Sequence, residues 1–156
     1  MKSLHLFLEV IVFAVLGTIC FAPEAFGKQV EYFSSQRNID NNYPFSNAVR
    51  VGDLLFLSGE LGTLPNSSKL VAGGIKNETK QTMNNIKVSL AKHSLTMNDL
   101  VKCTVMLADI KDWPAFNQVY TGYFPKHFPA RSAFATNGLA LNARVEVECI
   151  GAFSQQ

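Results

Sequence analysis

An arginine that follows a proline at the start of a predicted strand is the side chain with the clearest chemical potential. It lies in the segment Pro129-Ala130-Arg131-Ser132, and Glu146 follows on the next predicted strand. A guanidinium presents its N–H groups as a planar fork that can bind a carboxylate through two parallel hydrogen bonds. An arginine at this position can equally face solvent or pair with a neighbouring acid, and Glu146 can equally pair with Arg144 or Lys102. The functional interpretation is carboxylate binding beside a potential general base.

Motifs for other kinds of catalysis are missing. No Gly-rich phosphate loop follows a predicted strand, no Gly-x-Ser-x-Gly elbow occurs, and His and Cys are not found at metal-ligand spacing. Of the three histidines, only His93 and His127 lie beyond the N-terminal segment, and single histidines of this kind are typical of the protein surface. The sequence therefore disfavours metal and nucleotide chemistry.

The first 27 residues have the pattern of a secretory signal peptide. Lys2 precedes an apolar run, and Ala25-Phe26-Gly27 supplies the small residues of a cleavage site. The alternative is an uncleaved anchor, because Leu4 to Ala22 comes close to the roughly 20 residues that span a bilayer. Glu9 inside the run and the small residues at its end favour cleavage. We therefore expect a signal peptide over residues 1–27, a mature domain over 28–156, and a periplasmic or secreted protein with no further membrane contact.

Composition is typical of one globular domain. Of the 156 residues, 47% are hydrophobic and 17% charged, which excludes a disordered chain. Residues 28–156 contain 13 basic and 10 acidic residues, so their net charge is only +3. A nucleic-acid partner is not expected at this charge.

Hydrophobic patterning predicts two strands and then a helix. Residues 49–57 are apolar on both sides of Gly52-Asp53, which is typical of a β-hairpin, and the glycines and proline of 59–74 predict a loop. Between 77 and 93 apolar residues recur at intervals of three and four, which indicates an amphipathic helix. Its apolar stripe contains Met83, Ile86 and Leu90.

The second half of the chain repeats the alternation of strand and helix. Residues 101–107 alternate, and we expect the side chains of the odd-numbered residues to be buried. Asp112 is expected to cap a second helix that ends before Pro125, with Phe116, Val119, Tyr120 and Tyr123 as its apolar stripe. Strands over 132–134 and 145–149 follow. The order ββαβαββ predicts an α+β fold in which two helices cover one face of a single mixed sheet.

Two cysteines remain after signal removal. Cys103 and Cys149 both lie on the apolar faces of predicted strands, where free cysteine behaves as a small hydrophobic residue. In an exported protein two cysteines can also form a disulfide, provided that their Cα atoms lie within about 7 Å of each other. We expect buried thiols, with the disulfide as the alternative.

Three segments form a specific combination: Leu57-Ser58-Gly59, Pro129-Ala130-Arg131-Ser132 and Arg144-Val145-Glu146-Val147-Glu148. With Pro44-Phe45-Ser46 and Asn117-Gln118-Val119-Tyr120, they resemble the Rid/YjgF family of imine and enamine deaminases. The resemblance covers residues 44–153. The resemblance implies a chorismate-mutase-like subunit assembled as a homotrimer, with clefts between subunits. It also implies hydrolysis of small 2-imino and enamino acids to 2-oxo acids and ammonia, without a metal or organic cofactor.

Roles for single residues follow from the same resemblance. Arg131 would bind the substrate carboxylate, Glu146 would position or activate water, and Phe45, Ser58, Asn117 and Ser132 would line the cleft. The chain departs from the family at three positions, since Phe45 replaces a common Tyr, Ala133 a Cys found in some members, and Glu60 a usual Gln. We expect Glu60 to add negative charge near the site. The alternative function is a carboxylate-binding or interaction protein that keeps the trimer and has little deaminase activity.

Overall fold

The computed structural model describes residues 29–154. The predicted signal peptide at 1–27 lies outside the described residues, and so does the proposed cleavage site. Within residues 29–154, none of the helices has both the length and the hydropathy that a membrane span requires.

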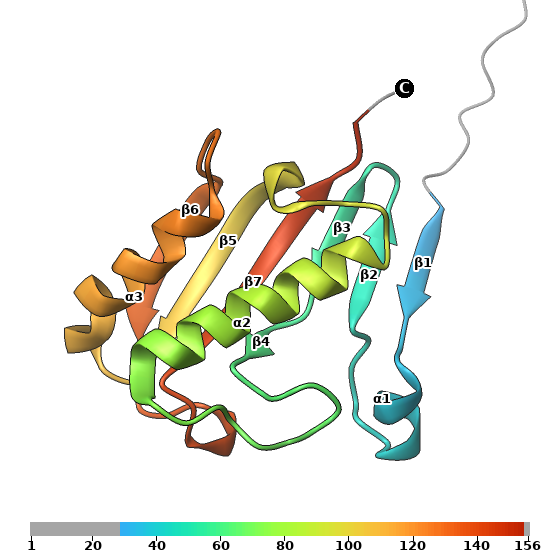
Figure 1. The fold of residues 1–156 in the computed structure, drawn as a ribbon. Helices are drawn as coiled ribbons and strands as arrows, with labels where there is room; N and C mark the ends of the chain where they lie inside the picture. Colours follow the sequence, from blue (N-terminus) through green and yellow to red (C-terminus); the bar gives the residue numbers. More distant parts are fainter. Residues whose placement is uncertain (1–28, 155–156) are drawn as a thin grey trace, which may run out of the picture.

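A single mixed sheet runs through the whole described domain (Figure 1). Six strands follow the order β1-β2-β3-β7-β5-β6, and the short β4 pairs with the first part of β7. The β5–β6 pair is parallel and the other pairs are antiparallel. The strands are β1 (Val30–Phe33), β2 (Ala48–Val51), β3 (Leu54–Leu57), β4 (Glu60–Leu61), β5 (Leu100–Leu107), β6 (Ala130–Ala135) and β7 (Val145–Ala152).

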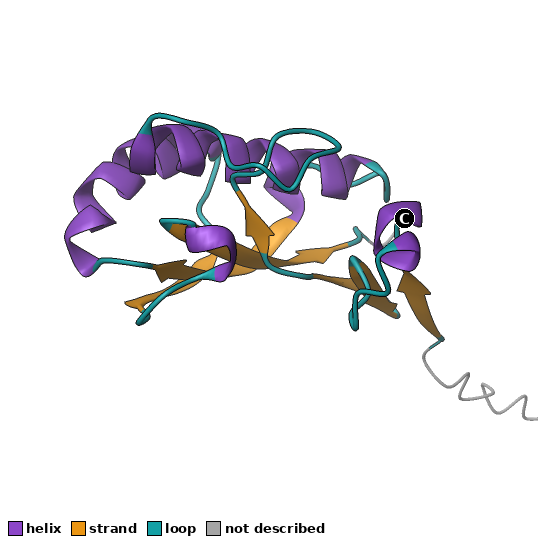
Figure 2. Cartoon of the chain, turned by 90° about the horizontal axis from the view of Figure 1, so that it is seen from below, coloured by secondary structure: helices purple, strands orange, loops and turns teal. Residues whose placement is uncertain are grey.

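Two helices cover one face of this sheet, as Figure 2 shows from the side. They are α2 (Gly74–Ala91) and α3 (Trp113–Tyr120), while the short α1 (Gln36–Asp40) follows β1 near one edge. The remaining helical segments are 3-10 turns at Met97–Asp99, Ile110–Asp112, Thr121–Tyr123 and Ala140–Asn142. The predicted α+β arrangement with two helices on one face is confirmed.

The core lies between the helices and this face of the sheet. The apolar stripe of α2 is fully buried, and the inward side chains of the central strands β5 and β7 meet it. These strand residues are Cys103, Val105, Leu107, Val145, Val147 and Cys149. Burying each large apolar side chain contributes about 1.5–3 kcal/mol, so this interface holds the two layers together.

The two cysteines form a disulfide, and the expectation of buried thiols is wrong. Cys103 on β5 and Cys149 on β7 are direct cross-strand neighbours, with 4.1 Å between their Cα atoms. Their side chains point to the same face because paired residues of an antiparallel ladder do so. This register, which brings the two sulfur atoms together, was not evident from the sequence.

Three further details differ from the sequence-based expectations. Strands β1 and β4 and helix α1 extend the predicted ββαβαββ order, and α2 begins at Gly74. Val101 is exposed, because the register of β5 against β7 shifts between Leu100 and Lys102. The side chain of Asp112 makes no capping hydrogen bond to α3, and it pairs with Arg144 at 2.6 Å instead.

The other face of the sheet carries rows of apolar side chains that the described chain leaves uncovered. Tyr32, Val49, Phe56 and Ile150 are successive cross-strand neighbours on β1, β2, β3 and β7. A second row contains Val30, Val51, Leu54 and Ala152. We call this surface the open face.

Candidate functional site

Arg131 is held on the helix-covered face at the edge of the sheet. It pairs in register with Cys103, and its guanidinium therefore lies under α3. The Nη1 group donates a 2.8 Å hydrogen bond to Oδ1 of Asn117. Aromatic rings of the same helix surround the charge, with the centroid of Tyr120 at 4.8 Å from Cζ. Arg131 and Asn117, two of the predicted site residues, are therefore in direct contact.

This guanidinium has no acidic partner among residues 29–154. The ion pair found there joins Arg144 to Asp112, and Nη1 of Arg131 donates only to the Asn117 amide. A half-buried cation without a carboxylate partner keeps its remaining N–H donors for another group. Its geometry is suited to a small carboxylate that approaches the edge of the sheet.

Glu146 lies on the open face, near the start of β7. Its register partners are Met106 on β5 and Leu61 on β4. Neither Arg144 nor Lys102 pairs with it, since Arg144 pairs with Asp112 and Lys102 donates to Ser132. Burial raises the pKa of the Glu146 carboxyl, and the negative charge of Glu148 raises it further. A carboxylate with a raised pKa is a better proton acceptor near neutral pH than an ordinary one.

Gly59 makes room for this carboxylate. A Cβ atom added at Gly59 would overlap Oε1 of Glu146, so no larger residue fits there while Glu146 keeps its position. Ser58, the preceding residue, donates a 2.6 Å hydrogen bond to the carbonyl oxygen of Ser46. That bond holds the end of β3 against the loop before β2, which carries Phe45. Phe45 is half-exposed and stacks on Tyr43 with 5.6 Å between ring centroids.

The predicted site residues therefore form two groups on opposite faces of the sheet. Arg131 pairs with Cys103 of β5, and Glu146 pairs with Met106 of β5. Because side chains alternate along β5, Arg131 and Glu146 point to opposite sides of the sheet. Arg131 and Asn117 lie on the helix side, and we call them the carboxylate-binding group after the role predicted for Arg131. Glu146 lies on the open side, and Gly59 and the Ser58–Ser46 hydrogen bond connect it along the chain to Ser58 and Phe45. We call Glu146, Ser58 and Phe45 the water-activating group after the role predicted for Glu146. A single copy of the chain does not bring the two groups together.

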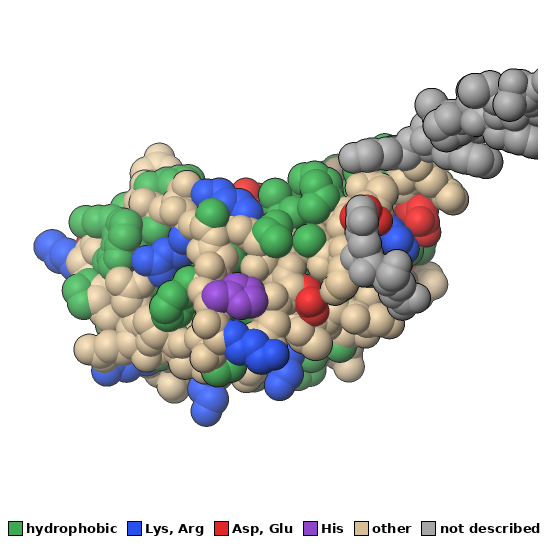
Figure 3. All heavy atoms as spheres, turned by 90° about the horizontal axis from the view of Figure 1, so that it is seen from above, with side chains coloured by type: hydrophobic (Ala, Val, Ile, Leu, Met, Phe, Trp, Pro, Cys, Tyr) green, Lys and Arg blue, Asp and Glu red, His purple; other side chains and the backbone are tan. Residues whose placement is uncertain are grey.

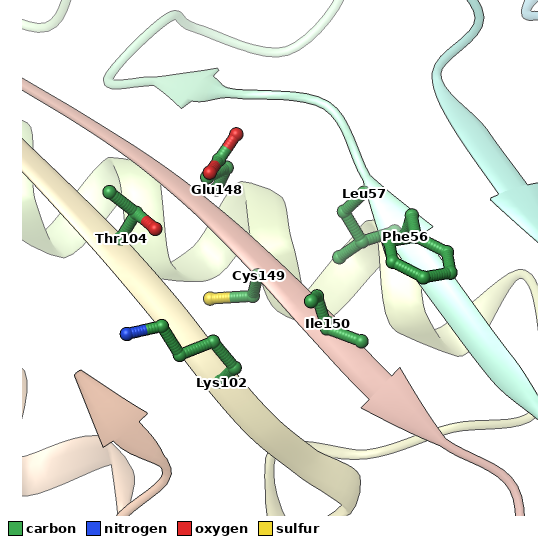
Figure 4. A pocket seen from close by; sticks show the side chains of 7 residues that line it. All are labelled: Phe56, Leu57, Lys102, Thr104, Glu148, Cys149 and Ile150. Carbon is green, nitrogen blue, oxygen red and sulfur yellow. The ribbon is translucent and has the colours of Figure 1, made fainter. Parts of the chain in front are cut away.

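Ser132 belongs to neither group. Its hydroxyl lies on the open face and accepts a 2.8 Å hydrogen bond from Nζ of Lys102. A pocket of about 170 Å³ lies nearby on the same face (Figure 4), lined by Phe56, Leu57, Lys102, Thr104, Glu148, Cys149 and Ile150. This pocket contains no predicted catalytic residue.

Two of the three departures from the family pattern can be placed. Glu60 pairs with Val147 and faces the helices, so it lies on the same side of the sheet as Arg131 and on the opposite side from Glu146. Its carboxylate accepts a 2.7 Å hydrogen bond from Ser89 of α2, and burial raises its pKa. Ala133 lies on the same face as Arg131, two residues along β6, and it packs against the core.

Metal-binding side chains do not cluster in the described part of the chain. No group of three or more His, Cys, Asp or Glu side chains there could hold a metal ion. Figure 3 shows the face seen from above, where Lys and Arg side chains lie in separate groups with apolar and neutral surface between them.

Sequence reasoning missed the surroundings of Arg131 and the role of Gly59. Phe116 and Tyr120 were expected only as core residues of the second helix, yet both rings also face the guanidinium. A signal was available, because α3 connects β5 to a parallel neighbour and such a helix packs over that pair of strands.

Comparisons with known proteins identify the family of the chain. Residues 35–153 match the Endoribonuclease L-PSP family. A goat protein named 2-iminobutanoate/2-iminopropanoate deaminase is 44% identical over 107 residues, which are 69% of this chain and 78% of the goat protein. The Arabidopsis thaliana Reactive Intermediate Deaminase A, chloroplastic, is 39% identical over 69% of this chain, and the match spans 57% of that longer relative.

A solved structure gives the same result for the fold. The Yersinia pestis protein YyfA, described as a protein of unknown function of the conserved Rid protein family, is 31% identical with a TM-score of 0.69. The match covers 71% of this chain and 89% of YyfA. By its matched residues, its relatives and its fold, the chain belongs to the Endoribonuclease L-PSP family, which is the Rid/YjgF family that its sequence resembles.

Proposed function

We propose that the protein hydrolyses small 2-imino and enamino acids to 2-oxo acids and ammonia. The observation that carries the proposal is the Arg131 guanidinium, which Asn117 and the rings of α3 hold in place without an acidic partner in residues 29–154. The names of the goat and Arabidopsis relatives support the same reaction.

The proposed mechanism uses orientation and one proton acceptor. Arg131 binds the substrate carboxylate and thereby fixes the adjacent imine carbon, which is already electrophilic. Glu146 accepts a proton from a water molecule. At the same time the water oxygen bonds to the imine carbon, and the C=N electron pair moves to nitrogen. Glu146 returns this proton to the nitrogen. The remaining hydroxyl proton then moves to the nitrogen as the C–O bond becomes a carbonyl and the C–N bond breaks, which releases ammonia and leaves the 2-oxo acid. No step requires an oxidant or a reductant.

The direct test is ammonia release from freshly generated 2-iminobutanoate. The expected result is a rate well above that of the same mixture without the protein, because imines also hydrolyse spontaneously. A protein that binds 2-oxobutanoate but does not accelerate ammonia release would support the alternative, a carboxylate-binding protein.

We further propose a homotrimer that completes the site between copies. Two observations support it: the carboxylate-binding and water-activating groups lie on opposite faces, and the open face carries two rows of uncovered apolar side chains. Large contiguous apolar surfaces of this kind mark interfaces. A second copy of the chain, packed on the open face, would supply the missing half of each site.

Light scattering is expected to give three times the subunit mass at micromolar concentration. Phe56→Glu should dissociate the assembly and abolish ammonia release, because it places a charge in the middle of the open face. Val88→Glu is the matched control, since Val88 is an exposed apolar residue on α2 and should tolerate the charge. A monomeric wild-type protein, or a Phe56→Glu variant that stays trimeric, would contradict the proposal.

We also propose that the protein is exported and that its mature form begins near Lys28. The N-terminal pattern of residues 1–27 supports this location, and so does the Cys103–Cys149 disulfide, because disulfides persist mainly in oxidising compartments. N-terminal sequencing of the protein from its native compartment should find Lys28 or a close neighbour. A chain that still starts at Met1 and sediments with membranes would instead indicate an anchor.

A further inference from the structure

The guanidinium of Arg131 is contacted by one hydrogen-bond acceptor and by three aromatic rings. The hydrogen bond to Oδ1 of Asn117 acts in the plane of the guanidinium, at 2.8 Å from Nη1. The ring of Tyr120 lies nearest among the aromatic rings, with its centroid at 4.8 Å from Cζ, whereas the centroids of Trp113 and Phe116 are both at 5.8 Å. Cations are attracted to ring faces within about 6 Å, so Tyr120 provides the strongest of these contacts.

Tyr120 is itself rigidly held. Its side chain is 3% exposed, and it packs between Phe116 and Phe124, whose ring centroids lie at 5.2 and 4.7 Å from its own. Its hydroxyl group is buried and makes no hydrogen bond to any of residues 29–154. The ring, rather than the hydroxyl, is therefore the part of Tyr120 that interacts with its surroundings.

We propose that Tyr120 is a positioning residue for carboxylate recognition, whose ring fixes the plane of the Arg131 guanidinium for an incoming substrate. An arginine side chain loses considerable rotamer entropy when it is immobilised, and a contact that already orders it lowers the cost of binding. This inference rests on the proposed function, because it assumes that Arg131 binds the carboxylate. Tyr120 itself does not touch the substrate.

The test compares KM and kcat for hydrolysis of 2-iminobutanoate. Tyr120→Leu removes the ring face while keeping an apolar side chain, and it should raise KM about tenfold. The kcat value should change by less than about twofold, because the lost contact orders the arginine equally in ground and transition states. Tyr120→Phe keeps the ring face and should restore the wild-type KM. Tyr120→Met takes the place of Tyr120→Leu if the latter does not fold.

Phe33→Leu is the matched control. Phe33 is an aromatic residue of β1 that packs against the core, and it lies at the opposite edge of the sheet from Arg131 on β6. This variant should lower the melting temperature as Tyr120→Leu does and leave KM unchanged. An unchanged KM in Tyr120→Leu, or an equal rise in Phe33→Leu, would overturn the inference.

Binding of 2-oxobutanoate separates this inference from the proposed function. If the wild-type protein releases no ammonia, the proposed function fails, but the Kd for 2-oxobutanoate still reports on Arg131. Tyr120→Leu should then weaken binding about tenfold, and Phe33→Leu should not. Equal Kd values for wild type and Tyr120→Leu would show that the ring does not position the guanidinium.

Discussion

Arg131→Ala is expected to abolish imine hydrolysis while leaving the protein folded and assembled. The loss should exceed about 100-fold, because a charge-assisted hydrogen-bond pair contributes about 1.5–3 kcal/mol and also fixes the reacting carbon. Arg131→Lys should restore only part of the activity, since an ammonium group cannot form the same two parallel hydrogen bonds. Ammonia release and mass are measured on the same sample, so that dissociation is not mistaken for loss of catalysis.

Arg50→Ala is the matched control for this experiment. Arg50 also lies over an aromatic ring, with Cζ at 4.1 Å from the centroid of Phe153, and its Nε donates to the carbonyl oxygen of Gly52. It belongs to neither group of site residues, and its replacement should leave the hydrolysis rate unchanged. Full activity in a trimeric Arg131→Ala variant would show that the carboxylate is bound elsewhere.

The second large effect is expected at Glu146 and at the glycine that faces it. Glu146→Gln should lower kcat by about 100-fold or more, because removal of a general base typically costs this much. Gly59→Ala should cause a loss of similar size, since the new methyl group displaces the Glu146 carboxylate and misplacement by about 1 Å can cost 100-fold. Gly122→Ala is the control, because a Cβ at Gly122 meets no atom within 4 Å.

The pH dependence gives an independent check on Glu146. Its pKa is raised by burial and by Glu148, so activity should fall on acidification at a higher pH than for a carboxyl with the ordinary pKa of 4.5. Glu148→Gln removes the neighbouring charge and should move this acidic limb to lower pH. If the limb does not move in Glu148→Gln, a different group limits the rate in acid.

Local periodicity predicted the main elements well because each buries one face over many residues. Helix α2 and strand β5 have this property, whereas the hairpin, whose strands have four residues each, was predicted from the Gly52-Asp53 turn between two apolar runs. Strands β1 and β4 are only four and two residues long, and they form because partners are already in place beside them. Such short segments have too little periodicity of their own to be recognised.

Pairing register explains both the wrong and the incomplete predictions about side chains. The disulfide depends on Cys103 facing Cys149, and the opposite placement of Arg131 and Glu146 depends on which residues of β5 they face. A shift of one residue would reverse each of these relations. The resemblance assigns roles to both residues, but only the register shows that one copy of the chain separates them.

The disulfide also makes the carboxylate-binding group part of a covalent ring. Cys103 and Cys149 are 46 residues apart, and α3, β6 and the exposed segment 125–128 all lie between them. Closing a ring of this length removes about 4 kcal/mol of chain entropy from the unfolded state. A protease that cuts the backbone once, for example after the exposed Lys126, therefore leaves both pieces joined, and Asn117 and Arg131 remain on one molecule although they then belong to different peptide fragments.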